Sequence, residues 1–121
     1  MKQITGHELT GMASAAADTA STALLLRPPP PLLLDVREPW EFSLAAIRIE
    51  GLETRLMPMN SVPAEFARLD PAQPVVCICH HGARSAQVVA FLERQGFEAV
   101  YNLAGGIEAW STQVDAAVPR Y

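Results

Sequence analysis

A cysteine stands where a short buried strand passes through a tight loop directly into a helix, and this junction constrains the fold more than any other feature. Residues 74–78 are apolar and β-branched, which is typical of a strand buried on both faces of a sheet. Residues 85–95 have helical spacing, and Gly96 follows them as a stop signal. We therefore expect Cys79 at the carboxyl end of a parallel strand, where ligands bind in open α/β sheets.

The loop that begins at Cys79 has the composition of an anion-binding site. Its sequence over residues 79–85 is Cys-His-His-Gly-Ala-Arg-Ser. The amide groups of such a loop and of the first helical turn converge and favour negative charge, which promotes ionisation of a thiol. Gly82 permits the backbone conformations of a tight loop, and Arg84 adds a fixed positive charge. The pattern predicts a nucleophilic thiolate at Cys79, and the alternative is a small buried hydrophobic residue.

Length and composition indicate one soluble globular domain. Half of the 121 residues are hydrophobic and 18% are charged, so we expect a single domain with its core over about 4–110 and a tail over 111–121. The net charge of −4 argues against nucleic-acid and membrane partners. We see neither an apolar run of the roughly 18 residues that a membrane helix needs nor a secretory signal pattern. Two cysteines with no sensible disulfide indicate a reducing, cytoplasmic location.

Strands and helices are expected to alternate along the chain. Strands are expected over residues 2–4, 32–36, 74–78 and 99–103, with another formed by 47–49, 56–59 or both. Helices are expected from a cap at Thr5 to about Ala20, at 38–42, at 63–69 behind a cap at Asn60 or Ser61, at 85–95 and at 107–113. The prolines of 27–31 predict a rigid extended connector. Such alternation predicts an α/β fold with a central parallel sheet and helices on both faces.

Three segments resemble single-domain rhodaneses in their order and spacing. They are residues 34–42 (LDVREPWEF), the loop 79–85, and residues 102–110 (NLAGGIEAW). The resemblance implies a parallel sheet of about five strands and a sulfurtransferase whose Cys79 alternates between thiolate and persulfide. Cys79 would take a sulfane sulfur from thiosulfate or another persulfide donor and pass it to cyanide or a thiol. The amide groups of 79–84 would surround the persulfide, and neither a metal nor an organic cofactor is expected.

Loop length separates sulfur transfer from phosphate chemistry. Four residues lie between Cys79 and Arg84, whereas related phosphatases and arsenate reductases have five. Because the extra residue enlarges the loop for a tetrahedral phosphate or arsenate, the shorter loop favours sulfur. Partners are then small sulfur donors and acceptors, with a donor protein that carries a persulfide as a further candidate. The main alternative is a non-enzymatic sulfur-relay or persulfide-binding module, and a phosphatase or arsenate reductase is disfavoured.

One segment departs from the family pattern. Many members have Gly-His-Ile after the acidic and aromatic segment, whereas this chain has Ala45-Ala46-Ile47. The stretch that continues to Pro58 also differs from the family. We expect this departure to affect the entry of substrate and to leave the anion-binding loop unchanged.

The residues next to Cys79 have open interpretations. His80 and His81 either carry positive charge near neutral pH and help to hold an anionic donor, or face solvent while the amides bind the anion. Ala83 and Ser85 complete the loop. A zinc site that combines these histidines with the two cysteines conflicts with geometry, because adjacent strand residues point to opposite faces.

Two charged residues at the same sheet edge are expected to support the loop. Asp35 would orient Arg84 or the loop, and Arg37 would contribute to the local field. The alternative is that Asp35 caps a helix and Arg37 forms a surface ion pair.

Three further residues are assigned mainly to packing. Cys77 lies two residues before Cys79 and starts toward the same side of the sheet. It is expected to be a core cysteine, and the alternative is a resolving thiol that attacks the persulfide. Trp40 and Trp110 are expected in the core or at the rim of the site.

Overall fold

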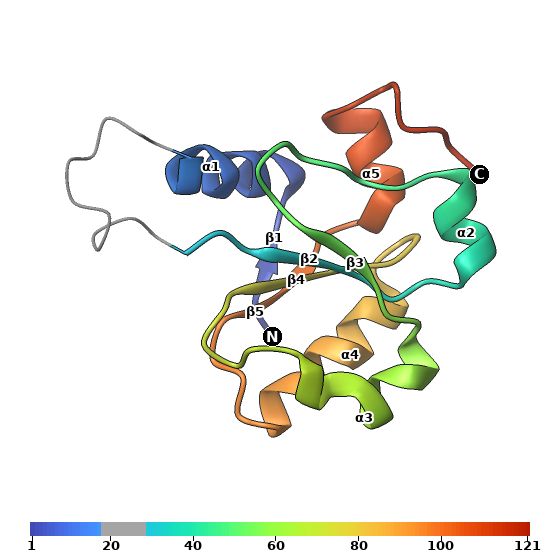
Figure 1. Ribbon diagram of the computed structural model, residues 1–121. Helices are drawn as coiled ribbons and strands as arrows, with labels where there is room; N and C mark the ends of the chain where they lie inside the picture. Colours follow the sequence, from blue (N-terminus) through green and yellow to red (C-terminus); the bar gives the residue numbers. More distant parts are fainter. Residues whose placement is uncertain (18–28) are drawn as a thin grey trace.

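Five parallel strands form one sheet in the order β1-β5-β4-β2-β3 (Figure 1). This architecture comes from a computed structural model that describes residues 1–17 and 29–121. The strands are β1 (Gln3–Ile4), β2 (Leu32–Asp35), β3 (Thr54–Leu56), β4 (Val75–Ile78) and β5 (Val100–Leu103). The α/β class with a central parallel sheet, which the alternating pattern predicted, is confirmed.

Helices cover both faces of this sheet. They are α1 (Gly6–Ala17), α2 (Pro39–Leu44), α3 (Val62–Glu65), α4 (Ala83–Arg94) and α5 (Gly106–Gln113), with 3-10 turns η2 (Met59–Ser61) and η3 (Phe66–Arg68). Figure 1 shows α1 and α5 on one face, α3 and α4 on the other, and α2 beyond the end of β2. Within the described ranges, no helix is both long and apolar enough to cross a membrane.

The alternation of side chains along each strand divides the core into two layers. On β2, Leu32 and Leu34 pack with α3 and α4, whereas Leu33 packs with α1 and α5. Every residue of β2 and β4 is buried, which explains why both strands are continuous apolar runs rather than alternating ones. Cys77 belongs to the α4 layer and is fully buried, and this burial raises the pKa of its thiol, as does the nearby Cys79.

Two expected elements differ in the structure. Residues 47–49 form no strand, because β3 pairs with β2 through Leu33↔Thr54 and Ile47 instead enters the core layer under α1 and α5. The helix expected at 63–69 is divided into α3 and η3, and the Ser61 hydroxyl donates to the carbonyl of Pro58 instead of capping it. The expected end of the first helix at about Ala20 and the first residues of the proline connector lie outside the described residues.

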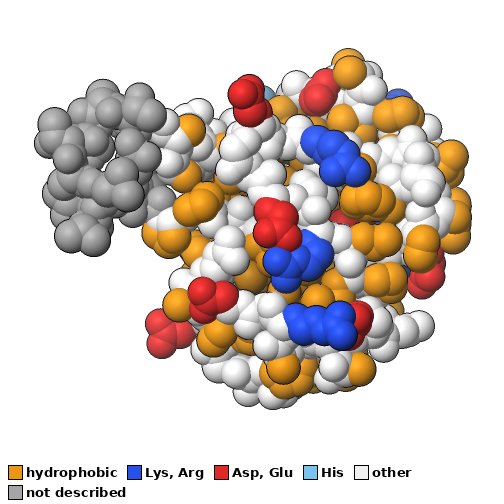
Figure 2. Space-filling model, viewed as in Figure 1, with side chains coloured by type: hydrophobic (Ala, Val, Ile, Leu, Met, Phe, Trp, Pro, Cys, Tyr) orange, Lys and Arg blue, Asp and Glu red, His pale blue; other side chains and the backbone are white. Residues whose placement is uncertain are grey.

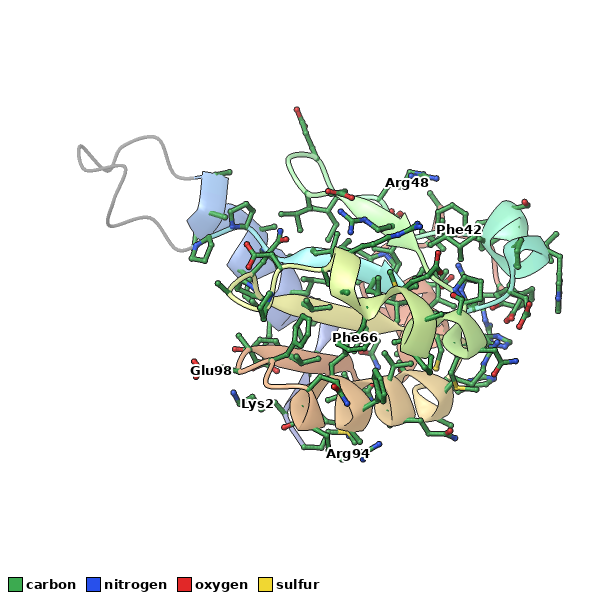
Figure 3. The ribbon with its side chains drawn as sticks, turned by 60° about the horizontal axis from the view of Figure 1, so that its bottom comes forward. Lys2, Phe42, Arg48, Phe66, Arg94 and Glu98 are labelled. Atoms are coloured by element: carbon green, nitrogen blue, oxygen red, sulfur yellow. The ribbon has the colours of Figure 1, made fainter. Side chains whose placement is uncertain are left out.

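Helix α2 is held against the segment that follows it. Figure 3 shows Phe42 and Arg48 side by side, and the Arg48 guanidinium lies 5.2 Å from the centre of the Phe42 ring. Such a cation–π contact contributes about 0.5–1 kcal/mol at an exposed position. It fixes α2 at the carboxyl edge of the sheet, beside the loop that contains Cys79.

The tail after α5 folds back onto the molecule. The Ser111 hydroxyl donates to the carbonyl of Val118 at 2.6 Å, and Val118 packs into the layer under α1 and α5. This return brings Tyr121 into contact with Glu41 of α2, although the two residues are 80 positions apart in the sequence. The tail is therefore part of the packed structure and reaches the carboxyl edge of the sheet.

Candidate active site

The loop between β4 and α4 lies at the carboxyl edge of the central strand. Cys79 directly follows β4 and is 1% exposed. Gly82 adopts a left-handed conformation with φ of 108°, which L side chains rarely tolerate, and it starts α4. The junction that the sequence predicted, a cysteine between a buried strand and a helix N-terminus, is thus present.

Two donors point at the sulfur of Cys79. The backbone N–H of Gly82 lies 3.0 Å from Sγ and the Ser85 hydroxyl lies 3.2 Å from it. The hydroxyl also contacts Oδ1 of Asn102, whose amide group donates to the carbonyl of Gly82 at 3.1 Å. Because one hydroxyl carries one proton, a thiolate at Cys79 competes with Asn102 for it. The Gly82 N–H and the Ser85 hydroxyl are both donors from which a thiolate at Cys79 can accept.

The N-terminus of α5 fixes the carbonyl groups of the loop on its far side. Ile107 N–H donates to the Cys79 carbonyl at 2.9 Å, and Glu108 N–H donates to the His80 carbonyl at 3.1 Å. Both carbonyl groups crowd Gly106, where a Cβ atom would lie 2.5 Å from either oxygen. Because these carbonyl groups face α5, the Gly82 N–H of the loop is free to face the Cys79 sulfur.

Arg84 is bound to a glutamate of α2. Its two terminal nitrogens donate to the two carboxylate oxygens of Glu41 at 2.6 and 2.8 Å. The hydrogen bonds from Arg84 are the largest cause that lowers the pKa of Glu41, from an ordinary 4.5 to about 2, although burial opposes the change. The same bonds raise the pKa of Arg84. The pair is therefore ionised at neutral pH.

Asp35 contacts Arg37 and not Arg84, so of the two expected roles of Asp35, orienting Arg84 or orienting the loop, the structure contradicts the first. The Arg37 Nε and one terminal nitrogen donate to the Asp35 carboxylate at 2.8 and 2.6 Å. Both side chains are buried, so the alternative of a surface ion pair is wrong as well. The reason is that Arg37, two residues along the same chain, occupies both oxygens of the Asp35 carboxylate, while Arg84 binds both oxygens of Glu41. Arg37 also donates to the carbonyl of Ala45, which ties the segment after α2 to the strand.

Tyr121 joins the two ion pairs. Its hydroxyl accepts from Arg37 at 2.8 Å and donates to Glu41 at 2.7 Å. Its ring stacks on His80 at a centroid distance of 4.0 Å, and His80 stacks on His81 at the same distance. Burial is the main cause that lowers the pKa of His80, and the repulsion from His81 adds to it. The His80 ring therefore packs against Tyr121 instead of facing solvent, and its lowered pKa favours the neutral form.

The two tryptophans differ in their environment. Trp110 is buried in the layer under α1 and α5. Trp40 is 61% exposed and meets the edge of the Tyr121 ring at 6.3 Å, so it lies at the rim.

Three residues of the site were missed by the sequence reasoning. Glu41 was visible inside the segment 34–42, where a glutamate three residues after Glu38 is typical of a helix start. Asn102 stands near the carboxyl end of a predicted strand, which was a usable signal. Tyr121 gave no signal, because its place depends on the path of the tail.

The charge distribution elsewhere is mixed. Figure 2 shows basic and acidic side chains interspersed on one face of the molecule. Among the described residues, Arg55 pairs with Glu53 and Arg68 with Glu65. This face offers no continuous positive surface over the part of the chain that the structure describes.

The parallel sheet, with a cysteine loop at the carboxyl end of its central strand, defines an α/β domain. Residues 18–113 match the family described as the rhodanese-like domain. The chain belongs to the rhodanese-like family.

Named relatives and a solved structure agree with this placement. The chain is 38% identical over 93 residues to the chloroplastic rhodanese-like/PpiC domain-containing protein 12 of Arabidopsis thaliana, which covers 74% of this chain and 30% of that protein. It is 40% identical over 79 residues to thiosulfate sulfurtransferase GlpE of Vibrio cholerae, which covers 64% of this chain and 70% of that protein. A crystal structure of a rhodanese-like domain protein from Staphylococcus aureus superposes with a TM-score of 0.70 at 28% identity, over 100% of this chain and 99% of that one. The chain thus spans less than a third of the Arabidopsis protein and most of the other two.

Proposed function

We propose that this protein is a rhodanese-type sulfurtransferase that carries sulfane sulfur on Cys79. The observation that supports it best is the pair of donors on the sulfur, Gly82 N–H at 3.0 Å and the Ser85 hydroxyl at 3.2 Å. A relative of 40% identity named thiosulfate sulfurtransferase supports the same activity. The free thiols of Cys77 and Cys79 fit a reducing, cytoplasmic location.

The proposed reaction has two steps at one sulfur. The Cys79 thiolate attacks the outer sulfur of thiosulfate, the sulfur–sulfur bond of the donor breaks, and its electron pair leaves with sulfite. The new Cys79 persulfide carries the negative charge, which the loop amides and Ser85 stabilise. Cyanide or a thiolate then attacks the outer sulfur, and the Cys79 thiolate leaves. No group beyond donor and acceptor is needed to balance atoms or charge.

Phosphate chemistry has less support. The loop has four residues between Cys79 and Arg84, and the Arg84 guanidinium already binds both oxygens of Glu41. An arginine that must clasp a phosphate bidentately would first have to leave this carboxylate.

The first experiment is the intact mass of the protein after brief incubation with thiosulfate. We expect a gain of one sulfur that cyanide removes, in the parent and in Cys77→Ser, and no gain in Cys79→Ser. Cys77→Ser is the matched control because both thiols are buried on the same side of the sheet. If neither thiosulfate nor an organic persulfide loads the parent, the enzyme proposal is wrong. If only a persulfide on a donor protein loads it, the sulfur-relay alternative takes its place.

A further inference from the structure

The arginines around the loop each have an acidic partner. Arg84 binds Glu41, Arg37 binds Asp35, and Arg120 binds Glu108 at 2.8 Å. Glu108 lies beside the loop because its backbone N–H donates to the carbonyl of His80. The first two pairs sum to zero charge beside Cys79. An ionised Cys79 therefore makes this group of residues negative before any donor arrives.

If the protein is the sulfurtransferase proposed above, the lack of net positive charge beside Cys79 disfavours an anionic donor more than a neutral one. Thiosulfate is a dianion, so its reaction with the Cys79 thiolate brings three negative charges together. A hydropersulfide of a thiol, R–S–SH, is neutral in the form whose outer sulfur accepts attack. In that reaction the Cys79 thiolate forms a bond to the outer sulfur, the sulfur–sulfur bond of the donor breaks, and the thiolate R–S⁻ leaves with the electron pair, so Cys79 becomes the hydropersulfide Cys79–S–SH. Only one negative charge is present throughout this reaction, so the loop amides can stabilise it without an additional unpaired cation.

The surface beside the loop also suits an organic donor. Trp40 is 61% exposed and meets Tyr121, which stacks on His80, which in turn stacks on His81. These four rings form an aromatic rim next to the nucleophile. An organic R group can pack on such a rim, whereas thiosulfate has no apolar part to bury.

We propose that Glu41 neutralises Arg84 and so sets the donor preference of Cys79 toward organic hydropersulfides and away from thiosulfate. Glu41 acts here as a positioning residue, because it contacts the arginine and not the reacting sulfur. Tyr121 holds the same carboxylate in place from the tail, eight residues beyond the end of the family match at residue 113. The tail contact therefore comes from residues that follow the family match.

A double-mutant cycle on Glu41 and Arg84 tests the proposal. Rates of Cys79 sulfur loading are measured by intact mass with thiosulfate and with 2-hydroxyethyl hydropersulfide, whose R group is uncharged. The proteins are the parent, Glu41→Gln, Arg84→Gln and the double variant, with Glu53→Gln as the control because Glu53 pairs with Arg55 on the surface. The quantity compared is the ratio of the thiosulfate rate to the hydropersulfide rate, which removes the intrinsic reactivities of the donors.

The expected ratios follow from the charge on each variant. Glu41→Gln frees the Arg84 charge and raises the ratio about tenfold, whereas Arg84→Gln leaves Glu41 unpaired and lowers it about tenfold. The double variant restores neutrality and returns within about twofold of the parent, and Glu53→Gln leaves the ratio unchanged.

Two results overturn the proposal, and they differ from the failure of the function itself. If both donors load the parent but the ratio is the same in all four proteins, or both rates fall equally, Glu41 has only a structural role. If no donor loads the parent, the sulfurtransferase function fails and the preference fails with it. Should Glu41→Gln not fold, the comparison of Arg84→Gln with the double variant still decides, because removal of the Glu41 charge should restore the ratio to within about twofold of the parent.

Discussion

At the scale of single residues, Gly106 shapes the active loop without contacting the sulfur. Gly106→Ala places a Cβ 2.5 Å from the carbonyl oxygens of Cys79 and His80, at a φ of +62°. We expect this variant to lose about 3 kcal/mol of stability and most of its sulfur loading, because the loop must move away from α5. Thermal unfolding and the intact-mass assay measure the two effects.

Gly51→Ala is the matched control for Gly106→Ala. Gly51 also has a positive φ, of +86°, but a Cβ there meets nothing within 4 Å. The control therefore carries the conformational strain alone, which costs about 1 kcal/mol, and it should load sulfur at the parent rate. Equal losses of loading in both variants would show that the carbonyl contacts of Gly106 do not hold the loop.

At the scale of elements, α2 contributes acid-sensitive stability through Glu41. The pKa of Glu41 in the folded protein is about 2, below its ordinary value of 4.5, so the folded state binds this proton less readily than the unfolded state. The stabilisation is complete above about pH 5 and is lost as the pH falls toward 2, and it amounts to roughly 3 kcal/mol. Unfolding by urea between pH 2 and 6 should show this slope in the parent and a shallower one in Glu41→Gln.

Glu53→Gln serves again as the control for the acid measurement, because the Glu53 side chain is 56% exposed and its ion pair with Arg55 is open to solvent. Its stability should follow the pH dependence of the parent. A slope that is the same in all three proteins would mean that the Arg84–Glu41 pair does not stabilise the fold.

The elements themselves were largely predictable, and the exceptions have physical causes. The strands before Asp35 and Cys79 were clear from their continuous apolar runs, since a strand covered on both faces must be apolar throughout. Neither candidate for the third strand, 47–49 or 56–59, matches it in full: β3 is Thr54–Leu56, and Ile47 is buried in the core without any pairing to β2. Burial and pairing leave the same apolar signal in a short segment, so the sequence could not separate them.

At the scale of the whole molecule, the network around the loop depended on contacts between distant segments. The cysteine, glycine and arginine of the loop are neighbours in sequence and were predicted together. The partner of Arg84 was not, because Glu41 lies 43 residues away in sequence and meets Arg84 only through the packing of α2 beside the loop. Tyr121 is 80 residues from Glu41 in sequence, so its contact followed only from the path of the tail.

That long-range contact makes the tail a stabilising part of the molecule. Tyr121→Phe keeps the stacking on His80 but removes the hydroxyl that accepts from Arg37 and donates to Glu41. Because one terminal nitrogen of the buried Arg37 then keeps only a long contact of 3.4 Å to the Glu41 carbonyl, and the Glu41 carboxylate loses one donor, we expect a loss of about 1–2 kcal/mol in the free energy of unfolding. The control is Tyr101→Phe, whose hydroxyl has no hydrogen bond among the described residues and whose removal should change stability by less than about 0.5 kcal/mol. Equal effects of the two variants on urea unfolding would mean that the tail packs on the site without stabilising it, and the link between the two ion pairs would then be dispensable for the fold.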